Sequence, residues 1–367
     1  MIVRDEEHVL GDCLRSIRDQ VDEIVITDTG STDRSREIAA TFGARVLERA
    51  WDDNFSAARN HSLEAATGDW ILYIDADERL DAPRRNMLRR TIAGHPGTAA
   101  FLVRLQPRES FSTYLEARLF RRDQRIRFAG RIHERIWPGI TALCKAENLS
   151  VARCAARIVH VGYEGDLTRK HNRNLPLLER AVTEDPERVY CWWHLGDTLA
   201  ALGRRAEAEA ALRSAIAVAK KTRVPGELFE ASLAYQTLAR IAFEAGEDPL
   251  PIIEDGLAAL PEDLALVFMK ARALINLKRY EAALALLHQL TAQNSDSFTD
   301  PHMAFDRRIF GEFAFDLAGV ALLRLGRFAE ASAAFANAAA AAPERDQIRY
   351  RAKAAVAARK GSSNAAG

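Results

Sequence analysis

The sequence predicts an α/β domain with a mostly parallel sheet, followed by an all-α domain of helical repeats. Short apolar segments of strand length alternate with helical segments through the first part of the chain, a spacing that favours parallel strands joined by crossover helices. From Arg169 onward the pattern is wholly helical and repeats itself. We place the α/β domain at residues 1–165, the helical repeats at 166–360 and a disordered tail at 361–367.

The composition excludes several classes of protein. The 51 Lys and Arg residues balance the 51 Asp and Glu residues, so no excess of positive charge favours nucleic acid or anionic lipid as a partner. No apolar run approaches the ~20 residues that span a bilayer. The four cysteines show no C-x-x-C spacing, which is typical of reduced thiols and not of a zinc site or a disulfide framework. We therefore expect a cytoplasmic protein with no nucleic-acid partner and no transmembrane segment.

Local patterns give the elements of the first domain in order. Apolar runs rich in β-branched and aromatic residues predict strands, and apolar residues three and four apart predict helices. The predicted strands are 1–3, 23–27, 44–47, 70–74, 99–105, 115–121, 126–128 and 158–163. The predicted helices span 8–18, run from the turn at 30–32 to about residue 42, and end near residue 68 after the 51–60 segment.

The strand at 70–74 ends abruptly in three acids, Asp75, Asp77 and Glu78. In an open α/β sheet, ligands bind beyond the carboxyl ends of such strands. Asp75 and Asp77 are two residues apart, so in extended backbone their side chains would leave the same face. Such a pair suits a hard divalent cation that shares its oxygen ligands with substrate phosphates. The alternative is a polar strand end followed by a helix that Asp77 or Asp81 caps.

A second acid follows an earlier strand. Asp28 lies at the end of the 23–27 strand, beside the N-terminus of the next helix. The dipole at such a terminus favours a phosphate group. Asp33 is most simply a first-turn acid that stabilises the same helix.

Four short motifs follow one another within the first 78 residues: Ile-Val-Arg-Asp-Glu-Glu from Ile2, Asp-Thr-Gly-Ser-Thr-Asp from Asp28, Phe-Ser-Ala-Ala-Arg-Asn from Phe55 and Asp-Ala-Asp-Glu from Asp75. With these motifs in this order, the chain resembles the family-2 glycosyltransferases over residues 1–165. It most resembles the branch that includes bacterial lipopolysaccharide-core and peptide S-glycosyltransferases. The resemblance implies a GT-A fold. One departure is that the family's first strand normally has more apolar residues before the position of Ile2.

The resemblance also implies roles for individual residues. Asp28 is similar to the acid that holds the base or ribose of the nucleotide. Arg59 and Asn60 match a segment that borders the nucleotide pocket, although both could instead only pin the start of their helix. Asp75 would lie near the ribose and diphosphate, and Asp77 resembles the acid that carries the metal ion, Mg²⁺ or Mn²⁺, with Asp75 beside it. The donor that the family leads us to expect is a UDP-sugar.

A Gly-Arg-Ile-His-Glu segment at 130–134 is typical of the same branch. Displacement at an anomeric carbon needs a base to take the proton of the acceptor, and a carboxylate in a closed site can do so. Glu134 is the candidate base, and His133 could position it or bind the metal or diphosphate; the alternative for both is a structural hydrogen bond. His160 could reach the metal or phosphate, or be a satisfied core histidine. Most of the eight arginines between 104 and 131 read as a solvated hairpin, with one or two available to diphosphate.

The second half follows the tetratricopeptide pattern, with small residues where two helices cross. Copies centre on Trp192 to Ala215, Leu277 to Leu287 and Gly319 to Pro343, with a degenerate copy from Tyr235 to Ala258 and an insertion at 293–305. Stacked helix pairs leave a concave surface, which suits a peptide or a partner subunit. A homodimer is compatible with this organisation.

Two functions from different classes remain. The first is a metal-dependent, inverting glycosyltransferase that moves a sugar from a UDP-sugar to a hydroxyl or thiol, with a peptide or protein acceptor favoured over an oligosaccharide or lipid-linked glycan. The second is a tetratricopeptide scaffold whose front domain has lost turnover; the presence of Asp28, Asp75, Asp77 and Glu134 argues against it. A nucleotidyltransferase is disfavoured because the segment at 4–7 is not a Gly-rich phosphate loop.

Overall fold

The computed structural model describes residues 1–107, 110–162, 167–222, 225–293, 299–300 and 304–365. The chain divides into two compact units, one formed mainly by residues 1–185 and the other mainly by residues 186–367. The predicted boundary between residues 165 and 166 lies outside the described residues. The helix that follows it, α6 (Leu167–Glu184), belongs to the first unit.

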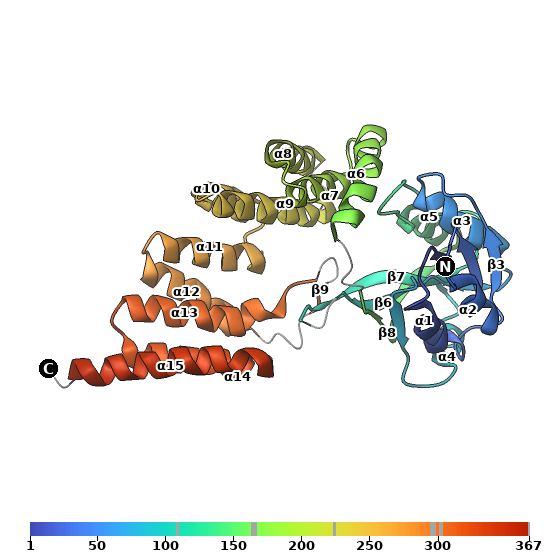
Figure 1. Cartoon of the computed structure of the whole chain (residues 1–367). Helices are drawn as coiled ribbons and strands as arrows, with labels where there is room; N and C mark the ends of the chain where they lie inside the picture. Colours follow the sequence, from blue (N-terminus) through green and yellow to red (C-terminus); the bar gives the residue numbers. More distant parts are fainter. Residues whose placement is uncertain (108–109, 163–166, 223–224, 294–298, 301–303, 366–367) are drawn as a thin grey trace. The chain divides into compact units, whose positions relative to one another are not determined.

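The first unit begins with a small parallel sheet (Figure 1). Its strands are β1 (Ile2–Val3), β2 (Val25–Asp28) and β3 (Arg45–Glu48), hydrogen-bonded in that order. The connecting helices are α1 (Leu10–Ile17) and α2 (Ser35–Thr41). The apolar residues of α1 recur at helical spacing and are buried, which fixes its inner face: Leu10, Cys13, Leu14 and Ile17.

A second, mixed sheet completes the first unit. Its strands lie in the order β4 (Trp70–Leu72), β7 (Thr113–Arg121), β6 (Thr98–Gln106), β8 (Ser150–His160) and β5 (Glu78–Asp81), and β9 (Thr299–Asp300) pairs with β7. The β6–β8 and β7–β9 pairs are parallel and the others are antiparallel. The helices of this part are α3 (Phe55–Ala65), α4 (Met87–Ala93) and α5 (Trp137–Glu147). The predicted α/β class is confirmed, with antiparallel pairing confined to the second sheet.

One predicted strand is wrong. Residues 126–128 form no strand, although Ile126 is fully buried. The side-chain amide of Asn60 accepts from the N–H of Phe128 and donates to its carbonyl, both at 2.9 Å, so these groups are satisfied without a neighbouring strand. α5 packs directly on the same segment, because a Cβ added at Gly139 would lie 2.3 Å from the carbonyl oxygen of Arg125. Side-chain contacts thus replace the expected hairpin.

The limits of two other elements differ from the expectation. β8 begins at Ser150 and ends at His160, whereas the pattern placed a strand at 158–163; residue 163 lies outside the described residues. β5 forms where the alternative interpretation of the acids placed a helix cap. It pairs Glu78 with His160 across the sheet, which brings the segment after Asp77 to the end of β8.

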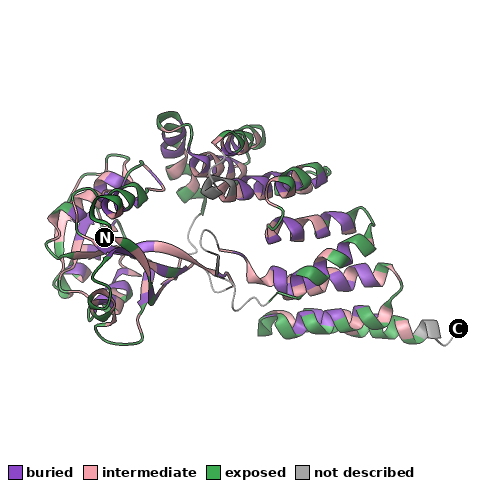
Figure 2. Ribbon diagram, turned by 180° about the vertical axis from the view of Figure 1, so that it is seen from behind, coloured by how far each residue is buried: buried purple, intermediate pink, exposed green. Residues whose placement is uncertain are grey.

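The second unit consists of paired helices. They are α7 (Val189–Ala201), α8 (Arg205–Thr222), α9 (Pro225–Glu244), α10 (Leu250–Ala259), α11 (Leu264–Asn276), α12 (Tyr280–Thr291), α13 (Glu312–Arg324), α14 (Phe328–Ala341) and α15 (Glu344–Ala365), with a short 3₁₀ turn η1 (Arg307–Phe310) before α13. Figure 2 shows buried residues on the inner sides of these helices and exposed residues on the outer sides. The predicted helical repeats are confirmed.

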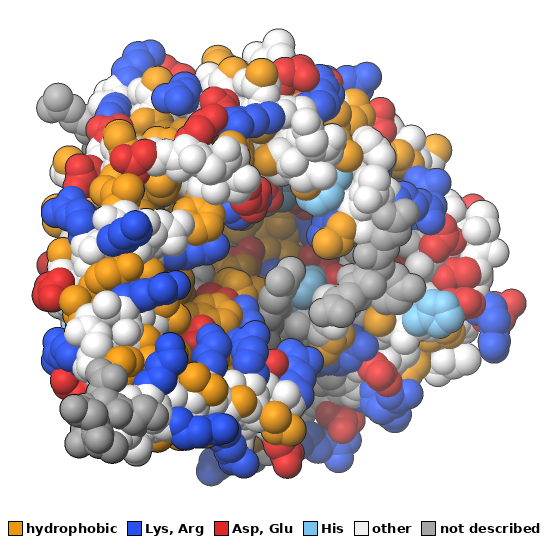
Figure 3. All heavy atoms as spheres, turned by 60° about the vertical axis from the view of Figure 1, so that its left-hand side comes forward, with side chains coloured by type: hydrophobic (Ala, Val, Ile, Leu, Met, Phe, Trp, Pro, Cys, Tyr) orange, Lys and Arg blue, Asp and Glu red, His pale blue; other side chains and the backbone are white. Residues whose placement is uncertain are grey.

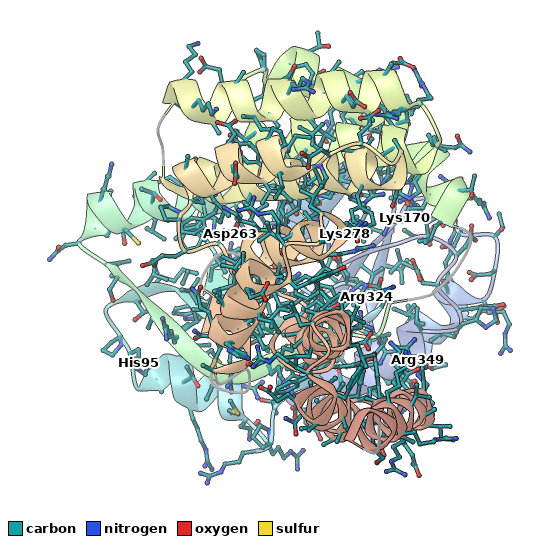
Figure 4. All side chains as sticks on the ribbon, turned by 90° about the vertical axis from the view of Figure 1, so that its left-hand side faces the viewer. His95, Lys170, Asp263, Lys278, Arg324 and Arg349 are labelled. Carbon is teal, nitrogen blue, oxygen red and sulfur yellow. The ribbon has the colours of Figure 1, made fainter. Side chains whose placement is uncertain are left out.

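Small residues allow the paired helices to approach closely. A Cβ at Gly196 of α7 would lie 2.5 Å from Leu212 of α8, and one at Gly319 of α13 would lie 2.6 Å from Phe335 of α14. These are the positions at which the repeat pattern predicts small side chains. α11 is delimited by Asp263, which accepts from the N–H of Leu266 at 2.9 Å, and by the positive φ of Lys278 (Figure 4).

Three expectations concern the chain as a whole. The structure continues α15 to Ala365, in the segment for which the composition predicts a disordered tail. Within the described residues, every helix is too short or too polar to cross a membrane. The four cysteines are free thiols. Lys and Arg side chains are interspersed with Asp and Glu over the face shown in Figure 3, in keeping with a formal net charge of zero.

Candidate functional site

The candidate site is built around the turn that follows β4. The chain leaves the strand after Leu72 but stays beside β7, where the N–H of Tyr73 donates to the carbonyl of Arg118 at 3.0 Å. Asp75 and Glu78 then close a turn: the N–H of Glu78 donates to the carbonyl of Asp75 at 3.1 Å, and the carboxylate of Glu78 accepts from the N–H of Asp75 at 2.8 Å. The backbone at 75–78 is therefore turned and not extended.

Arg59 of α3 joins two of the predicted site residues. Its two terminal nitrogens donate to the carboxylate oxygens of Asp75 at 2.7 and 3.0 Å, and its Nε donates to Oε1 of Glu134. Side-chain exposure is only 13% for Arg59 and 11% for Glu134. A forked guanidinium pair is among the stronger ionic contacts in proteins. The structure thus brings together three residues that the sequence had assigned to separate motifs.

Two aromatic rings flank the Arg59 guanidinium. The rings of Tyr73 and Phe128 lie 5.3 and 5.6 Å from its central carbon and meet each other edge to face. Desolvation opposes the ionisation of Asp75, but attraction to Arg59 and the hydrogen bonds from it outweigh this effect and lower the pKa of Asp75. Asp75 is therefore an anion that is already paired within the protein.

A buried ion pair fixes Glu78, the residue whose carboxylate closes this turn. Arg118 of β7 donates to both oxygens of Glu78, at 2.8 and 2.9 Å, and both side chains are almost fully buried. Arg118 also lies 3.1 Å from Glu116, which accepts from the hydroxyl of Tyr73 at 2.6 Å. Burial raises the pKa of Glu78 in spite of the Arg118 charge. The sequence pattern places most arginines of this region in solvent, whereas Arg118 is buried. Glu116 and Arg118 alternate with apolar residues along β7, and this alternation is the signal that could have shown that both lie on one face of a strand.

Asp77 and His160 form a second group. The N–H of Val161 donates to the carbonyl of Asp77 at 2.9 Å, and Oδ2 of Asp77 then lies 3.5 Å from Nε2 of His160. Both side chains are about one-third exposed. Because the backbone turns at 75–78, Asp77 faces His160 while Asp75 faces Arg59. Among the described residues, no three His, Cys, Asp or Glu side chains form a group that could hold a metal ion by themselves.

Asp28 lies at the end of β2 and is buried. Its Oδ1 accepts from the N–H groups of Gly30 and Ser31, at 3.1 and 3.0 Å, and from Nε of Arg36 at 2.9 Å. Desolvation opposes ionisation, but the hydrogen bonds from Ser31 and its neighbours outweigh it and lower the pKa of Asp28. Its other oxygen, Oδ2, is buried and has no partner in the described part of the chain. An unpaired carboxylate oxygen is available to accept a hydrogen bond from a ligand.

Asn60 and His133 are the two predicted site residues that flank this arrangement. Both ends of the Asn60 amide bond to the backbone of Phe128, so this side chain fixes the segment that flanks Arg59. His133 has a positive φ of 54°, within a loop that paired hydrogen bonds between Ala129 and Arg135 close at its base. The loop presents Glu134 to Arg59.

The sequence interpretation missed Glu6. The backbone around it is fixed to the start of α2: the N–H of Glu6 donates to Ser35 at 2.8 Å, and the N–H of Glu7 donates to Asp33 at 2.9 Å. Burial, together with the carboxylates of Asp77 and Asp75, raises the pKa of Glu6 to about 7. Glu6 therefore belongs to the electrostatic environment of the site. Glu6 is part of the Arg-Asp-Glu-Glu motif at residues 4–7, but the sequence pattern assigned no functional role to the residues of this motif.

With this geometry in place, comparison with known proteins identifies the domain. Residues 1–152 match the family model Glycosyl transferase family 2, and residues 189–222 match Tetratricopeptide repeat. The N-terminal domain is therefore a glycosyltransferase domain. It belongs to family 2, as the resemblance predicted, and tetratricopeptide repeats follow it.

Three curated relatives illustrate the likeness. A TPR repeat-containing protein of Synechococcus elongatus is 38% identical over 205 residues, 54% of this chain and 51% of the relative. The SPbeta prophage-derived glycosyltransferase SunS of Bacillus subtilis is 27% identical over 229 residues, 60% and 53% of the two chains. The lipopolysaccharide core biosynthesis glycosyltransferase LpsC of Rhizobium meliloti is 29% identical over 152 residues, 38% and 56%. The chain thus spans about half the length of these relatives.

Two solved structures are also similar to parts of this chain. The mannosyltransferase PcManGT of Pyrobaculum calidifontis, in complex with GDP-Man and Mn²⁺, is 16% identical with a TM-score of 0.41, covering 73% of this chain and 81% of that one. The TPR protein TTC0263 of Thermus thermophilus is 24% identical with a TM-score of 0.35, covering 52% and 92%.

Proposed function

We propose that the protein is a metal-dependent, inverting glycosyltransferase that takes its sugar from a nucleotide-sugar, with UDP-sugars favoured. The observation that carries the proposal is the arrangement in a family-2 domain of Arg59, Asp75 and Glu134 beside the Asp77–His160 pair. Asp75 and Asp77 follow the end of β4, and His160 lies at the end of β8. Such ends are where α/β folds bind nucleotides.

Asp77 and His160 fit a divalent cation. One carboxylate oxygen and one imidazole nitrogen 3.5 Å apart are suitable donors for Mg²⁺ or Mn²⁺. A cation with so few protein ligands takes the remainder from substrate phosphates, which agrees with the lack of a self-sufficient metal cluster among the described residues. When bound, the cation supplies positive charge to the diphosphate.

Asp28 is suited to hold the nucleoside. Its Oδ1 is saturated by backbone N–H groups and Arg36, which fixes the carboxylate, and Oδ2 is free to accept from a base N–H or a ribose hydroxyl. Asp75 is already engaged by Arg59, so its role is to hold Arg59 beside the diphosphate.

Glu134 is the proposed base. Its Oε1 is fixed by Arg59, and its Oε2 makes no hydrogen bond within the described residues. The free oxygen would take the proton of the acceptor hydroxyl or thiol as the acceptor oxygen or sulfur bonds to the anomeric carbon. The bond from that carbon to the diphosphate oxygen breaks, and the nucleoside diphosphate leaves with the electron pair. A single displacement of this kind inverts the anomeric configuration.

The acceptor and location complete the proposal. A peptide or protein acceptor is favoured, because stacked repeats offer a surface for an extended chain, with a glycan as the second choice. We also propose a cytoplasmic location, where nucleotide-sugars would reach the domain.

Calorimetric titration of UDP, with and without Mn²⁺, tests the donor site. We expect metal-dependent binding to the wild type and its loss in Asp77→Ala. Asp81→Ala is the matched control, since Asp81 pairs with Arg157 on the surface of β5 and should retain binding. Failure of the wild type to bind UDP, GDP, CDP or TDP with either metal would favour the alternative, a repeat scaffold with an inactive front domain.

Hydrolysis of UDP-sugars tests the base separately. Glu134→Gln keeps the size of the side chain and a hydrogen-bond acceptor for Arg59, so UDP should bind as in the wild type. We expect turnover to fall by about 10²-fold or more. Unchanged turnover would remove Glu134 from the mechanism while leaving the donor site intact.

A further inference from the structure

The helix α6 lies outside both matched regions, which end at residue 152 and begin at residue 189. The charged residues of α6 interact unfavourably with its helix dipole. Basic residues such as Arg169 and Arg173 lie in the first half, and the acids Glu184 and Asp185 stand at its C-terminal end. Because anions are unfavourable at a helix C-terminus, these two acids do not serve the stability of α6 itself.

One face of α6 contacts the start of α3 and the segment just before it. Arg173 lies 5.7 Å from the ring of Phe55, and Arg180 lies 3.6 Å from Asp53. Residues 173, 180 and 184 are seven and four apart, a spacing that places them on one side of a helix. The contacts therefore form a row along the helix and end at its acidic terminus.

The two acids hold both ends of the loop that carries Glu134. Glu184 pairs with Nε of Arg131 at 2.7 Å, and Asp185 pairs with Arg135 at 2.8 Å. Arg131 precedes Glu134 by three residues and Arg135 follows it directly. No other side-chain partner of these two arginines is found in the described part of the chain.

The inner side of the same loop is fixed by hydrogen bonds to α3. The N–H of Phe55 donates to the carbonyl of Arg131 at 2.8 Å, and the hydroxyl of Ser56 donates to the carbonyl of Gly130 at 2.6 Å. Beyond these two bonds, Glu134 contacts α3 through the Nε of Arg59. The two ion pairs to α6 hold the outer side of the loop.

We propose that Glu184 and Asp185 are positioning residues that hold the 130–135 loop so that Glu134 meets Arg59 and the substrate. This inference rests on the proposed function of Glu134. The four side chains of these pairs are between 28% and 51% exposed, and exposed pairs contribute little to global stability. Their effect is on geometry, where a displacement of about 1 Å can reduce the rate a hundredfold.

The double variant Glu184→Gln/Asp185→Asn removes both charges and keeps the side-chain shapes. We expect kcat for UDP-sugar hydrolysis to fall about tenfold with the donor KM within about twofold of wild type. Hydrogen exchange of the amides at 132–135 should accelerate, with little change elsewhere. Glu187→Gln is the matched control: it removes the exposed pair with Lys221, at 3.0 Å, and should change neither quantity.

A charge exchange separates positioning from a general loss of structure. Arg131→Glu alone should behave like the double variant, and Arg131→Glu/Glu184→Arg should recover most of kcat and of the exchange protection. Wild-type kcat and unchanged exchange at 132–135 in the double variant would overturn the inference, as would a failure of the exchanged pair to recover either quantity. If the wild type turns over no UDP-sugar, the proposed function fails, but hydrogen exchange still decides whether α6 holds the loop.

Discussion

Arg59 donates both terminal nitrogens of its guanidinium to the carboxylate of Asp75, at 2.7 and 3.0 Å. The same guanidinium contacts Glu134 through Nε, although Glu134 is 75 residues further along the chain. A single cation therefore holds two acids that the motifs assign to different roles. The geometry of the donor side and of the proposed base depends on one side chain.

Replacement of Arg59 by lysine should disrupt both contacts. An ammonium group is a point charge without the planar fork, so it cannot serve Asp75 and Glu134 at once. Because the pair is largely buried, we expect Arg59→Lys to lose about 2–3 kcal/mol of unfolding free energy in urea and most of its UDP-sugar turnover. Arg157→Lys is the control: Arg157 pairs with Asp81 but is 41% exposed, and its loss should cost less than about 1 kcal/mol. Equal losses in the two variants would contradict this prediction.

The Glu78–Arg118 pair should show strong coupling in a double-mutant cycle. Arg118→Met leaves a buried carboxylate unpaired and should cost about 3–5 kcal/mol of unfolding free energy. Glu78→Gln/Arg118→Met removes both charges, so it should be more stable than Arg118→Met alone. Urea unfolding of the wild type, the two single variants and the double variant gives the coupling energy. A coupling energy near zero would mean that solvent screens the Glu78–Arg118 pair, and this would contradict the burial of both side chains.

These two contacts show how far the sequence could predict the site. Arg59, Asp75 and Asp77 were identified because each follows a local signal, a strand end or a helix start, within a recognisable motif. Arg118 was not singled out, because its burial depends on the pairing of β7 with β4 and β6, strands that are distant in sequence. Local periodicity contains no information about that pairing.

The same limit explains the errors in the fold. The parallel β1–β2–β3 sheet follows from strands joined by single helices, and it was predicted. The antiparallel pairs of the second sheet and the absence of a strand at 126–128 depend on contacts made across the chain. For residues 126–128 the deciding contact is the amide of Asn60, 68 residues away from Phe128.

The contact between Asn60 and the backbone of Phe128 allows a test of two roles for Asn60, one in fixing this backbone and one in bordering the nucleotide pocket. If it only holds the backbone of Phe128, Asn60→Ala leaves one N–H and one C=O unpaired and should cost about 1–3 kcal/mol of unfolding free energy. The affinity for UDP and Mn²⁺, measured by calorimetry, should stay within a few-fold of wild type. A loss of UDP binding at unchanged stability would instead assign Asn60 to the nucleotide pocket. Ser62→Ala is the control on α3, since its hydroxyl donates only within the helix.

The raised pKa of Glu6 predicts a pH-dependent gain of stability on its replacement. The pKa of Glu6 rises from 4.5 to about 7 because burial and the carboxylates of Asp77 and Asp75 disfavour its charge. Between these values the folded protein holds a proton that the unfolded chain has released, so the free energy of unfolding falls as the pH rises through this window. Above about pH 7 the full penalty is present.

Glu6→Gln removes that penalty. In metal-free buffer we expect the variant to be more stable than wild type at pH 8, by about 1 kcal/mol after allowance for solvent screening of a half-buried side chain. At pH 4 both proteins carry a neutral side chain at this position, and their stabilities should converge. Urea unfolding at the two pH values measures the difference, with Glu64→Gln, an exposed position on α3, as the control. A variant that is equally or less stable at pH 8 would show that the Glu6 carboxylate is ionised and satisfied in the folded protein, and would place a cationic partner beside it.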